Sequence, residues 1–264
     1  MPTPFDPVPA ARLLANATNT RTQFKELPEA NRPRSLAEAY DVQDRMARDA
    51  GTPGGLADTI AGWKLGFGSA NGMKAAGLDR PAVGRVLKGR LYRDGDAVPV
   101  PAASKALVEI EIAFTLGRDV TPTDTLSNPL DCVADTHIAC ELVLSRFIDR
   151  TKVGLPSFIA DSVGFHALVV GQKLDVKTIE TVARTAVVLV DGKETAGSQT
   201  GGDTIDAVWS LGQLMAHARE RGLTLRKGEI VTTGTITKPF DAPTPSSLVV
   251  TATGAGLRFS LKAA

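Results

Sequence analysis

Alternation of apolar and polar positions is clearest in residues 104–116, which read Ser-Lys-Ala-Leu-Val-Glu-Ile-Glu-Ile-Ala-Phe-Thr-Leu. β-Branched and aliphatic residues fill this stretch and neither glycine nor proline interrupts it, so it predicts a β-strand. Successive side chains of a strand point to opposite faces, so Glu109 and Glu111 share one face. The pattern therefore places two carboxylates together in an otherwise apolar strand.

Helical periodicity marks the beginning of the chain. We expect helices over residues 7–30 and 35–51, where apolar residues recur at three- and four-residue spacings. The Gly-Thr-Pro-Gly-Gly run of residues 51–55 is the clearest linker in the chain. We therefore predict a small helical N-terminal region, residues 1–55, followed by a larger domain, residues 56–264.

The next segments are mostly strand and turn. The strand predicted over residues 59–69 turns its large apolar side chains to one face, which leaves Lys64 on the other face between two glycines. A lysine flanked by glycines leaves room for a ligand to approach, although an exposed strand lysine has the same pattern. Residues 79–84 read as a loop. Residues 130–146 fit a helix, but residues 139–144 fit a buried strand equally well.

One more long helix and several strands complete the pattern. Residues 205–218 carry an apolar stripe at helical spacing, and Gly222 closes that helix. Further strands are predicted over residues 160–171, 185–190, 230–237, 247–253 and 257–261. We therefore assign the chain to the α+β class.

The composition excludes several kinds of partner. Among 264 residues, 30 lysines and arginines balance 29 aspartates and glutamates, and no basic tract with interleaved aromatic residues is present. We therefore expect neither nucleic acid nor a membrane surface as a partner. The sequence starts without the charged and apolar segments of a secretion signal, and no apolar run reaches membrane-spanning length. These features predict a cytoplasmic protein.

Cysteine and histidine usage predicts no zinc site. Cys132 and Cys140 form no CxxC pair, so we expect buried thiols. The histidines share no ligand spacing, and His217 falls in a predicted helix, where we expect it at the surface. No GxGxxG or GxSxG frame is present, so neither a dinucleotide site nor a serine nucleophile is predicted.

The acidic residues are the strongest candidates for chemistry. Glu109 and Glu111 lie in apolar surroundings, and they need water or a cation if both are ionised. A half-buried strand with its polar face in solvent explains the same pattern, so both interpretations stay open at this point. Glu141 adds a third carboxylate inside an apolar run, and burying it without a partner would cost several kcal/mol or shift its pKa strongly. The third carboxylate therefore favours the interpretation as a divalent-metal site.

The order of these segments resembles the fumarylacetoacetate hydrolase superfamily, and within it the branch of 2-keto-4-pentenoate hydratases and 4-oxalocrotonate decarboxylases. Matching segments run from about residue 35 to the end of the chain. They are the Gly-Trp-Lys-Leu-Gly of residues 62–66, the Val-Glu-Ile-Glu-Ile-Ala of residues 108–113, Glu141, the Ala-Asp of residues 160–161 with the strand to residue 171, and residues 222–235.

The resemblance implies a mixed β-roll with peripheral helices. It also implies that Glu109, Glu111 and Glu141 are ligands of Mg²⁺ or Mn²⁺, because three carboxylates plus waters suit such hard, octahedral cations. The expected partners are a small-molecule 2-oxo acid substrate and further copies of the chain in a homo-oligomer. A complex with a related hydratase or decarboxylase is the alternative assembly.

The activity implied by the resemblance is that of a metal-dependent lyase in aromatic meta-cleavage catabolism. The leading hypothesis is a hydratase that adds water to a 2-hydroxy-2,4-dienoate and gives a 4-hydroxy-2-oxo acid. Lys64 would stabilise the enolate oxygen or donate a proton, and Asp161 or a metal-bound carboxylate would activate the water. Ser69 and Thr235 would position the substrate carboxylate. The alternatives are decarboxylation of a 2-oxo-hexenedioate, C–C bond hydrolysis of an acylpyruvate, and a metal-binding paralogue with little or no turnover.

Two positions depart from the family pattern. Family hydratases commonly carry an aspartate in a Pro-Asp-aromatic-Gly pattern, where this chain has Pro-Ala-Val-Gly at residues 81–84. Asp79 is the candidate substitute for the aspartate that Ala82 replaces. A serine often found shortly after the equivalent of Asp161 falls on Gly164 here. These departures affect the prediction of substrate and reaction more than the prediction of fold or metal.

Overall fold

Two sheets and a set of peripheral helices make up the part of the chain that the computed structural model describes, residues 4–101 and 104–264. The α-helices are α1 (Pro7–Thr20), α2 (Leu36–Arg48), α3 (Ala70–Ala76), α4 (Leu155–Ala160), α5 (Ile179–Thr185) and α6 (Ala207–Glu220). The strands are β1 (Ile60–Gly66), β2 (Ala82–Leu87), β3 (Leu91–Arg93), β4 (Ala97–Val100), β5 (Ala106–Leu116), β6 (Val133–Val143), β7 (Phe165–Leu174), β8 (Val187–Val190), β9 (Lys193–Gly197), β10 (Ile230–Thr235), β11 (Phe240–Ala242), β12 (Ser246–Ala252) and β13 (Ala255–Ala263). The 3₁₀ turns used below are η2 (Lys88–Arg90), η4 (Ser162–Gly164) and η6 (Gly201–Asp203).

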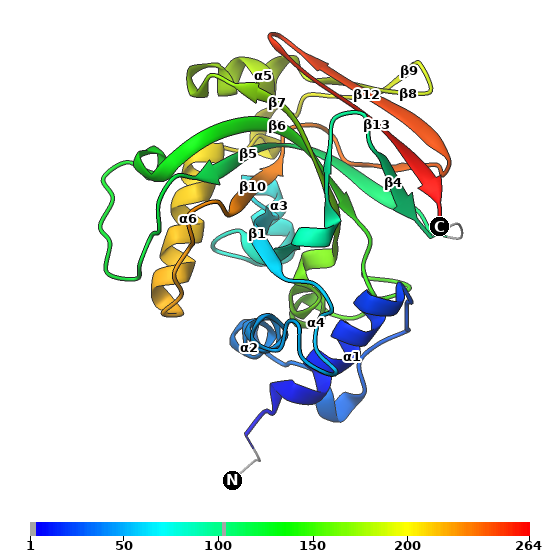
Figure 1. Cartoon of the computed structure of the whole chain (residues 1–264), viewed down its shortest axis with the longest axis vertical. Coiled ribbons are helices and arrows are strands. Elements are labelled where there is room, and N and C mark those ends of the chain that lie inside the picture. The colour runs from blue at the N-terminus through cyan, green and yellow to red at the C-terminus, as the bar shows by residue number, and fades with distance from the viewer. Residues whose placement is uncertain (1–3, 102–103) are drawn as a thin grey trace.

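The larger sheet has the strand order β2-β1-β10-β5-β6-β7-β3, with β11 paired beside β5. Its β1–β10 and β3–β7 pairs are parallel, whereas the central β10–β5–β6–β7 pairs are antiparallel. The smaller sheet, in the order β4-β13-β12-β8-β9, packs on β6 and β7 through β13 (Figure 1). Mixed sheets with helices at their periphery confirm the predicted α+β class.

Strand β5 separates two hydrophobic cores, and its two faces contribute to different ones. The core between the sheets takes Val108, Ile110, Ile112 and Phe114. The other core includes Ala113 of β5 and residues of α1, α2 and α4, the helices below the sheet in Figure 1. Glu109 and Glu111 share the face of Ala113, because side chains alternate along a strand. The predicted alternation of residues 104–116 is therefore confirmed for Glu109 and Glu111, which lie on one face of β5.

Four predicted elements differ from the observed ones. The strand predicted over residues 160–171 begins only at Phe165, because Ala160 ends α4 and residues 162–164 form η4. The first helix ends at Thr20 and not near residue 30, because Arg21 takes a left-handed conformation with φ 54°. The helix predicted over residues 130–146 is wrong and the strand alternative for residues 139–144 is confirmed: Pro129–Cys132 form a 3₁₀ turn and Val133–Val143 form β6, because β6 pairs with β5 on one edge and β7 on the other. The predicted loop of residues 79–84 already contains the start of β2, which pairs with β1 from Ala82 onward.

His217 is buried, and its predicted surface position is wrong. Only 5% of the residue is exposed, and its ring packs edge-on against Tyr40 of α2 with 4.5 Å between ring centroids. Burial lowers the pKa of His217 to about 4. The helical pattern around His217 could not show that α2 covers this side of α6. Cys132 and Cys140 are buried free thiols, as predicted.

Helix α2 is tied to the domain that follows it. The side-chain amide of Gln43, which is 2% exposed, donates to the carbonyls of Val83 (2.8 Å) and Ile159 (2.5 Å). These carbonyls belong to β2 and α4, so one side chain joins α2 to two elements of the later chain. The boundary near residue 55 stays a prediction.

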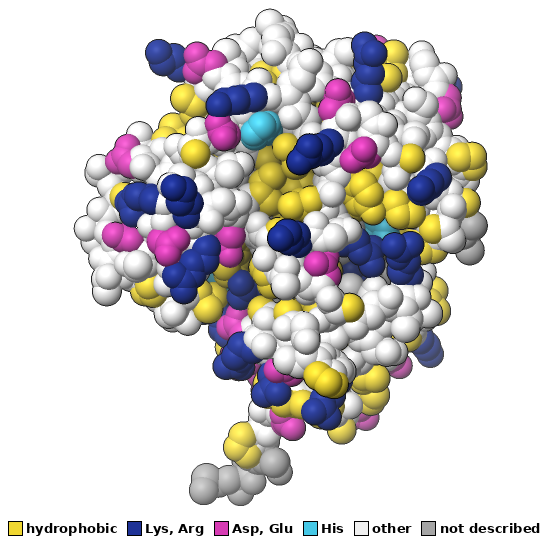
Figure 2. All heavy atoms as spheres, viewed as in Figure 1, with side chains coloured by type: hydrophobic (Ala, Val, Ile, Leu, Met, Phe, Trp, Pro, Cys, Tyr) yellow, Lys and Arg dark blue, Asp and Glu magenta, His cyan; other side chains and the backbone are white. Residues whose placement is uncertain are grey.

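The face shown in Figure 2 has no large patch of one charge sign, because lysine and arginine side chains are interspersed with aspartate and glutamate. This mixture matches the formal net charge of +1. Among the residues described, no helix has the length and apolar character needed to span a membrane.

Candidate metal centre and active site

Three carboxylates meet where β5 and β6 pair. Glu109 of β5 lies directly opposite Glu141 of β6, and Glu111 follows on the same face. One oxygen from each of these glutamates lies within 4.8 Å of the others. Glu111 and Glu141 are fully buried, and Glu109 is half-buried. Strand register therefore brings together residues that are about thirty positions apart in the sequence.

Several oxygens of this cluster lack a hydrogen-bond donor. Glu111 Oε2 accepts from the backbone N–H of Gly234 at 2.7 Å, but Glu111 Oε1 and both oxygens of Glu141 meet no donor in hydrogen-bond geometry. Buried polar atoms are almost always satisfied, so such orphaned oxygens point to an absent partner. Hard oxygen donors that converge in this way fit Mg²⁺ or Mn²⁺.

Lys64 provides the positive charge beside the carboxylates. It is 1% exposed, so the alternative of an exposed strand lysine is wrong. Its Nζ lies 3.1 Å from Glu141 Oε1 and donates to the carbonyl of Val163 at 3.4 Å. The flanking glycines are required by close packing, because a Cβ on Gly62 would lie 1.9 Å from the carbonyl oxygen of Ile230.

Charge and burial shift the pKa values of this group together. Burial raises the pKa of Glu111 well above its usual value, and the charges of Glu141 and Glu109 raise it further. Burial also raises the pKa of Glu141, to about 7, although the Lys64 ammonium opposes the shift. Burial lowers the pKa of Lys64, but the three carboxylates outweigh this effect and the net shift is upward. When all three carboxylates are deprotonated, three negative charges face one positive charge, and a divalent cation would match this surplus.

Trp63 fixes β1 from its other face. Its indole N–H donates to Glu229 Oε2 at 2.8 Å, and the guanidinium of Arg85 lies 3.7 Å from the ring centroid. Arg85 in turn pairs with Asp44 of α2 at 2.6 Å. A cation over an aromatic face and two charge-assisted hydrogen bonds hold the strand next to Lys64.

A left-handed turn supplies the carbonyl that Lys64 contacts. Ser162, Val163 and Gly164 have φ angles of 51°, 53° and 74°. This region is unfavourable for the two residues with a Cβ, so the surroundings must hold the turn in place. A Cβ on Gly84 would lie 2.4 Å from the carbonyl oxygen of Ser162, so only glycine lets β2 approach the turn this closely.

Asp161 and Arg146 form a second buried ion pair, next to this turn. The side chain of Ser145 (2.7 Å) and the backbone N–H of Arg146 (3.0 Å) donate to Asp161 Oδ2, and the guanidinium donates to Oδ1. The guanidinium also donates to the carbonyls of Asp161 and Phe165, which flank the turn. The pair therefore clamps both ends of the turn, and both carboxylate oxygens of Asp161 are engaged.

A cavity of about 280 Å³ opens beside Glu109. Ser69 and Thr235 both line it, as do Gly66 and Gly234. The Ser69 hydroxyl accepts from the N–H of Gly72 at the start of α3 (3.0 Å), and the Thr235 hydroxyl donates to the carbonyl of Thr237 (2.8 Å). The structure thus brings Ser69, Thr235 and Glu109 to one cavity.

Two polar residues of the cavity were not among the predicted site residues. Gln199 and Asp203 line it from the segment before α6. Asp203 Oδ1 accepts from the Asn71 side-chain amide at 3.0 Å, which links η6 to α3. The Gly-Gly pair before Asp203 signals a turn in the sequence, but only the fold places that turn against α3 and at the cavity.

The structure does not bring Asp79 to this cavity. Its side chain is 85% exposed and lies 3.7 Å from Arg80. Ala82, where the family pattern has an aspartate, is buried opposite Gly66 of β1. Gly164 has a positive φ, and a Cβ there would lie 2.8 Å from a side-chain carbon of Val143, which explains why a serine is absent at that position.

The sequence and the fold are both similar to known proteins. Residues 79–257 match the family described as fumarylacetoacetate hydrolase, C-terminal. The chain is 27% identical over 232 residues to a 2-keto-4-pentenoate hydratase of Paraburkholderia phymatum, covering 86% of each chain. It is 27% identical over 184 residues to the 2-keto-4-pentenoate hydratase of Burkholderia vietnamiensis, covering 68% of this chain and 69% of that protein.

Solved structures show the same fold. The 4-oxalocrotonate decarboxylase of Pseudomonas putida G7, complexed with magnesium and adipate, matches with a TM-score of 0.82 at 20% identity and covers 97% of each chain. The same enzyme complexed with calcium and acetate matches with a TM-score of 0.77 at 19% identity, covering 97% of this chain and 96% of that chain. The expected β-roll architecture is confirmed by this likeness.

Proposed function

The chain belongs to the fumarylacetoacetate hydrolase family, and on that premise we propose that it is a divalent-metal-dependent hydratase of 2-hydroxy-2,4-dienoates. The observation that carries the proposal is the buried set of Glu109, Glu111 and Glu141, with orphaned oxygens, beside the Lys64 ammonium. The names of its relatives, several of them 2-keto-4-pentenoate hydratases, support the reaction class.

Glu109, Glu111 and Glu141 would hold Mg²⁺ or Mn²⁺ through their carboxylate oxygens. When bound, the cation supplies Lewis-acid polarisation of an electron-rich substrate oxygen. The carboxylates otherwise repel an anionic substrate, so metal loading and substrate binding are linked by charge. The cavity beside Glu109 is where the substrate would meet this cluster.

Lys64 would stabilise negative charge on the C2 oxygen as the dienol becomes an unsaturated ketone. The ammonium is held by Glu141 and by the carbonyl of Val163, so it is oriented before substrate arrives. Ser69 and Thr235 would hold the substrate carboxylate at the cavity wall, and the polar side chains of Gln199 and Asp203 line the same cavity.

Asp161 enters this proposal as a residue that holds the turn under Lys64, because Arg146 and Ser145 occupy its oxygens. We propose no role for Asp79, whose carboxylate lies at the surface. The net reaction is addition of one water across the C3–C4 double bond of the unsaturated 2-oxo acid, with hydroxide at C4 and a proton at C3.

The test is turnover of 2-hydroxypenta-2,4-dienoate by purified protein with Mg²⁺ or Mn²⁺. Turnover is measured as the loss of dienol absorbance. Glu111→Gln should lower turnover by about 10³-fold or more and weaken Mn²⁺ binding, because it removes an anionic ligand. Glu180→Gln, at an exposed position of α5, is the matched control and should leave both unchanged. Wild-type protein that binds Mn²⁺ but leaves this dienoate and its longer analogues unchanged would refute the hydratase proposal.

Decarboxylation of a 2-oxo-hexenedioate is the second candidate, supported by the structural likeness to 4-oxalocrotonate decarboxylase. This reaction needs a group that recognises a second, distal carboxylate. Among the described residues that line the cavity there is neither lysine nor arginine, and Arg85 is engaged with Trp63 and Asp44. The lining therefore favours a monocarboxylate. Release of CO₂ from the dicarboxylate faster than hydration of the dienoate would reverse this preference.

A further inference from the structure

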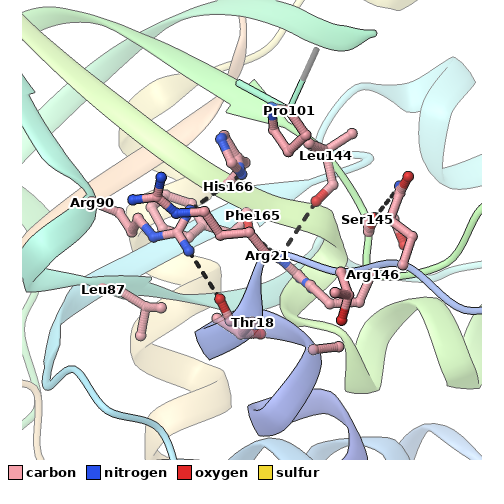
Figure 3. Close-up of a pocket in the computed structure, with 13 residues that line it drawn as sticks. Thr18, Arg21, Leu87, Arg90, Pro101, Leu144, Ser145, Arg146, Phe165 and His166 are labelled. Carbon is pink, nitrogen blue, oxygen red and sulfur yellow. Dashed lines mark hydrogen bonds between the residues drawn. The ribbon is translucent and has the colours of Figure 1, made fainter. Parts of the chain in front are cut away.

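A second, smaller pocket lies where the end of α1 meets η2 and the adjoining ends of β6 and β7 (Figure 3). None of the residues that line it lines the cavity beside Glu109, so the two are separate. Its lining includes the basic side chains of Arg21, Arg90, Arg146 and His166. Figure 3 shows Arg21 and Arg90 converging beside His166.

Arg146 and His166 need no further partner. Arg146 is paired with Asp161. His166 Nε2 lies 3.1 Å from the carbonyl oxygen of Pro99, so Nε2 carries the proton and Nδ1 accepts from Arg90 at 3.4 Å. Burial lowers the pKa of His166 to about 4, and the neighbouring arginines lower it too, so the ring is neutral at pH 7.

Arg90 and Arg21 are not neutralised in this way. Arg90 is partly buried, and its Nη2 donates to the carbonyl of Thr18 at 3.0 Å, near the end of α1. Across residues 4–101 and 104–264, no ion pair joins a carboxylate to Arg90 or Arg21. Burial lowers the pKa of Arg90, and the charges of Arg21 and Arg146 lower it further. Among the described residues, two positive charges thus meet here with no carboxylate paired to either; the charge of Asp58 acts on Arg90 too, but less than these effects do.

Capping of α1 accounts for only part of this arrangement. The carbonyl end of a helix carries roughly half a negative charge, which offsets part of the charge of Arg90. It does not account for Arg21, which ends α1 in a left-handed conformation and sends its side chain to the same pocket. The remaining positive charge is what a small anion would neutralise.

We propose that this pocket binds a small oxyanion of charge near −2, with inorganic phosphate as the reference ligand. Guanidinium groups match such anions because their planar N–H donors bind two oxygens at once. The pocket is partly open to solvent, and a water-sized group can move over only about 20 Å³ inside it, so one oxygen enters and the rest of the anion stays at the mouth. So narrow a space suits a small oxyanion better than a nucleotide or an aromatic acid.

The experiment uses the full chain loaded with Mg²⁺ and measures phosphate binding by calorimetry and by the shift in Tm. Phosphate should raise Tm by a few degrees relative to chloride at equal ionic strength, because a ligand of the folded state stabilises it. Sulfate should act similarly and acetate weakly, which separates a dianion site from a carboxylate site.

The variants Arg21→Gln and Arg90→Gln should each weaken phosphate binding about tenfold or more. Arg12→Gln, an exposed position on α1 with the same loss of charge, should bind phosphate as the wild type does. If Arg90→Gln does not fold, Arg21→Gln decides, because the exposed Arg21 side chain makes no described hydrogen bond.

Results of two kinds would overturn the proposal. The first kind concerns the arginines: it comprises a wild type with no phosphate-dependent shift, an Arg21→Gln variant that binds phosphate normally, and equal loss of binding in Arg12→Gln. Loss of phosphate binding in Glu111→Gln, or on removal of Mg²⁺ with EDTA, would place the anion at the metal centre and would also overturn it. None of these outcomes depends on turnover, so they test the anion site independently of the hydratase activity.

Discussion

The two buried ion pairs of this chain, Lys64–Glu141 and Arg146–Asp161, differ in how completely their charges are matched. Both lie in the interior, next to the same left-handed turn of residues 162–164. Asp161 has a donor for each carboxylate oxygen. Glu141 faces two further carboxylates, and both of its oxygens lack a donor in hydrogen-bond geometry.

This difference separates a structural pair from a functional one. A buried pair whose hydrogen bonds are complete can hold the backbone, and breaking it leaves an uncompensated charge. A pair with surplus charge of one sign is costly until a ligand completes it, and such sites are where ligands bind.

Asp161→Ala should destabilise the fold by about 3–5 kcal/mol, because it leaves the Arg146 guanidinium buried without a carboxylate. Urea unfolding measures this change. The control is Glu180→Ala, which breaks an exposed pair with Arg184 and should cost less than about 0.5 kcal/mol. A stable Asp161→Ala variant that has lost turnover would instead give Asp161 a role in proton transfer.

Lys64→Met should lower kcat on 2-hydroxypenta-2,4-dienoate by about 10²–10³-fold, equivalent to about 3–4 kcal/mol, with a smaller change in KM. The ammonium that faces the developing negative charge is lost, whereas the three carboxylate ligands remain. Mn²⁺ titration should show that metal still binds. Lys64→Met with wild-type kcat would remove Lys64 from the mechanism.

The metal-free protein should lose stability as pH rises from about 4.5 to 7, by an amount on the order of 2 kcal/mol. In that window the folded state keeps a proton on Glu141, whose pKa is raised to about 7, while the unfolded chain has released it. Buried His166 and His217 give the opposite slope between pH 4 and 6.5, because the unfolded chain takes up protons there first.

Because of those histidines, the measured quantity is the difference in unfolding free energy between wild type and Glu141→Gln across this pH range. The difference should shrink when Mg²⁺ is present. Equal slopes in the two metal-free proteins would show that Glu141 is not the titrating group.

Gly84→Ala should cost roughly 1–2 kcal/mol, because its Cβ would lie 2.4 Å from the carbonyl oxygen of Ser162 and push the turn outward. Turnover should fall about tenfold as the carbonyl of Val163 moves away from Lys64. Gly212→Ala in α6 is the control, since its Cβ would meet Pro129 at 3.4 Å. Unchanged kcat in Gly84→Ala would show that the turn does not orient Lys64.

The local pattern of apolar and polar residues was sufficient to predict the elements that are defined by their own segment alone. The alternation of β5 was read correctly, because side-chain period alone defines it. The helix of residues 205–218 was also found, although α6 begins at Ala207 and Trp209 of its apolar stripe is exposed. The local pattern was insufficient for β6, where Glu141 lies at helical spacing from His137 but where pairing on both edges decides the structure. The buried position of His217 depends in the same way on α2, a distant element.

From the sequence, the candidate site could be predicted only where charged residues lie in apolar runs. Glu109, Glu111 and Glu141 stand out because carboxylates are rare in such runs. Asp203 and the pair of Arg21 and Arg90 have no comparable signal, because loops and helix ends are normally polar. Only the fold shows which of these polar residues share a pocket.

Trp63 gives the protein an optical reporter beside its proposed chemistry. The indole is 2% exposed, stacks under Arg85 and precedes Lys64 by one residue, whereas the second tryptophan, Trp209, is 38% exposed. Acrylamide should therefore quench the emission of Trp209 and leave that of Trp63. The emission that remains comes from the strand that carries Lys64, so stopped-flow fluorescence can follow metal loading and substrate arrival without any added label.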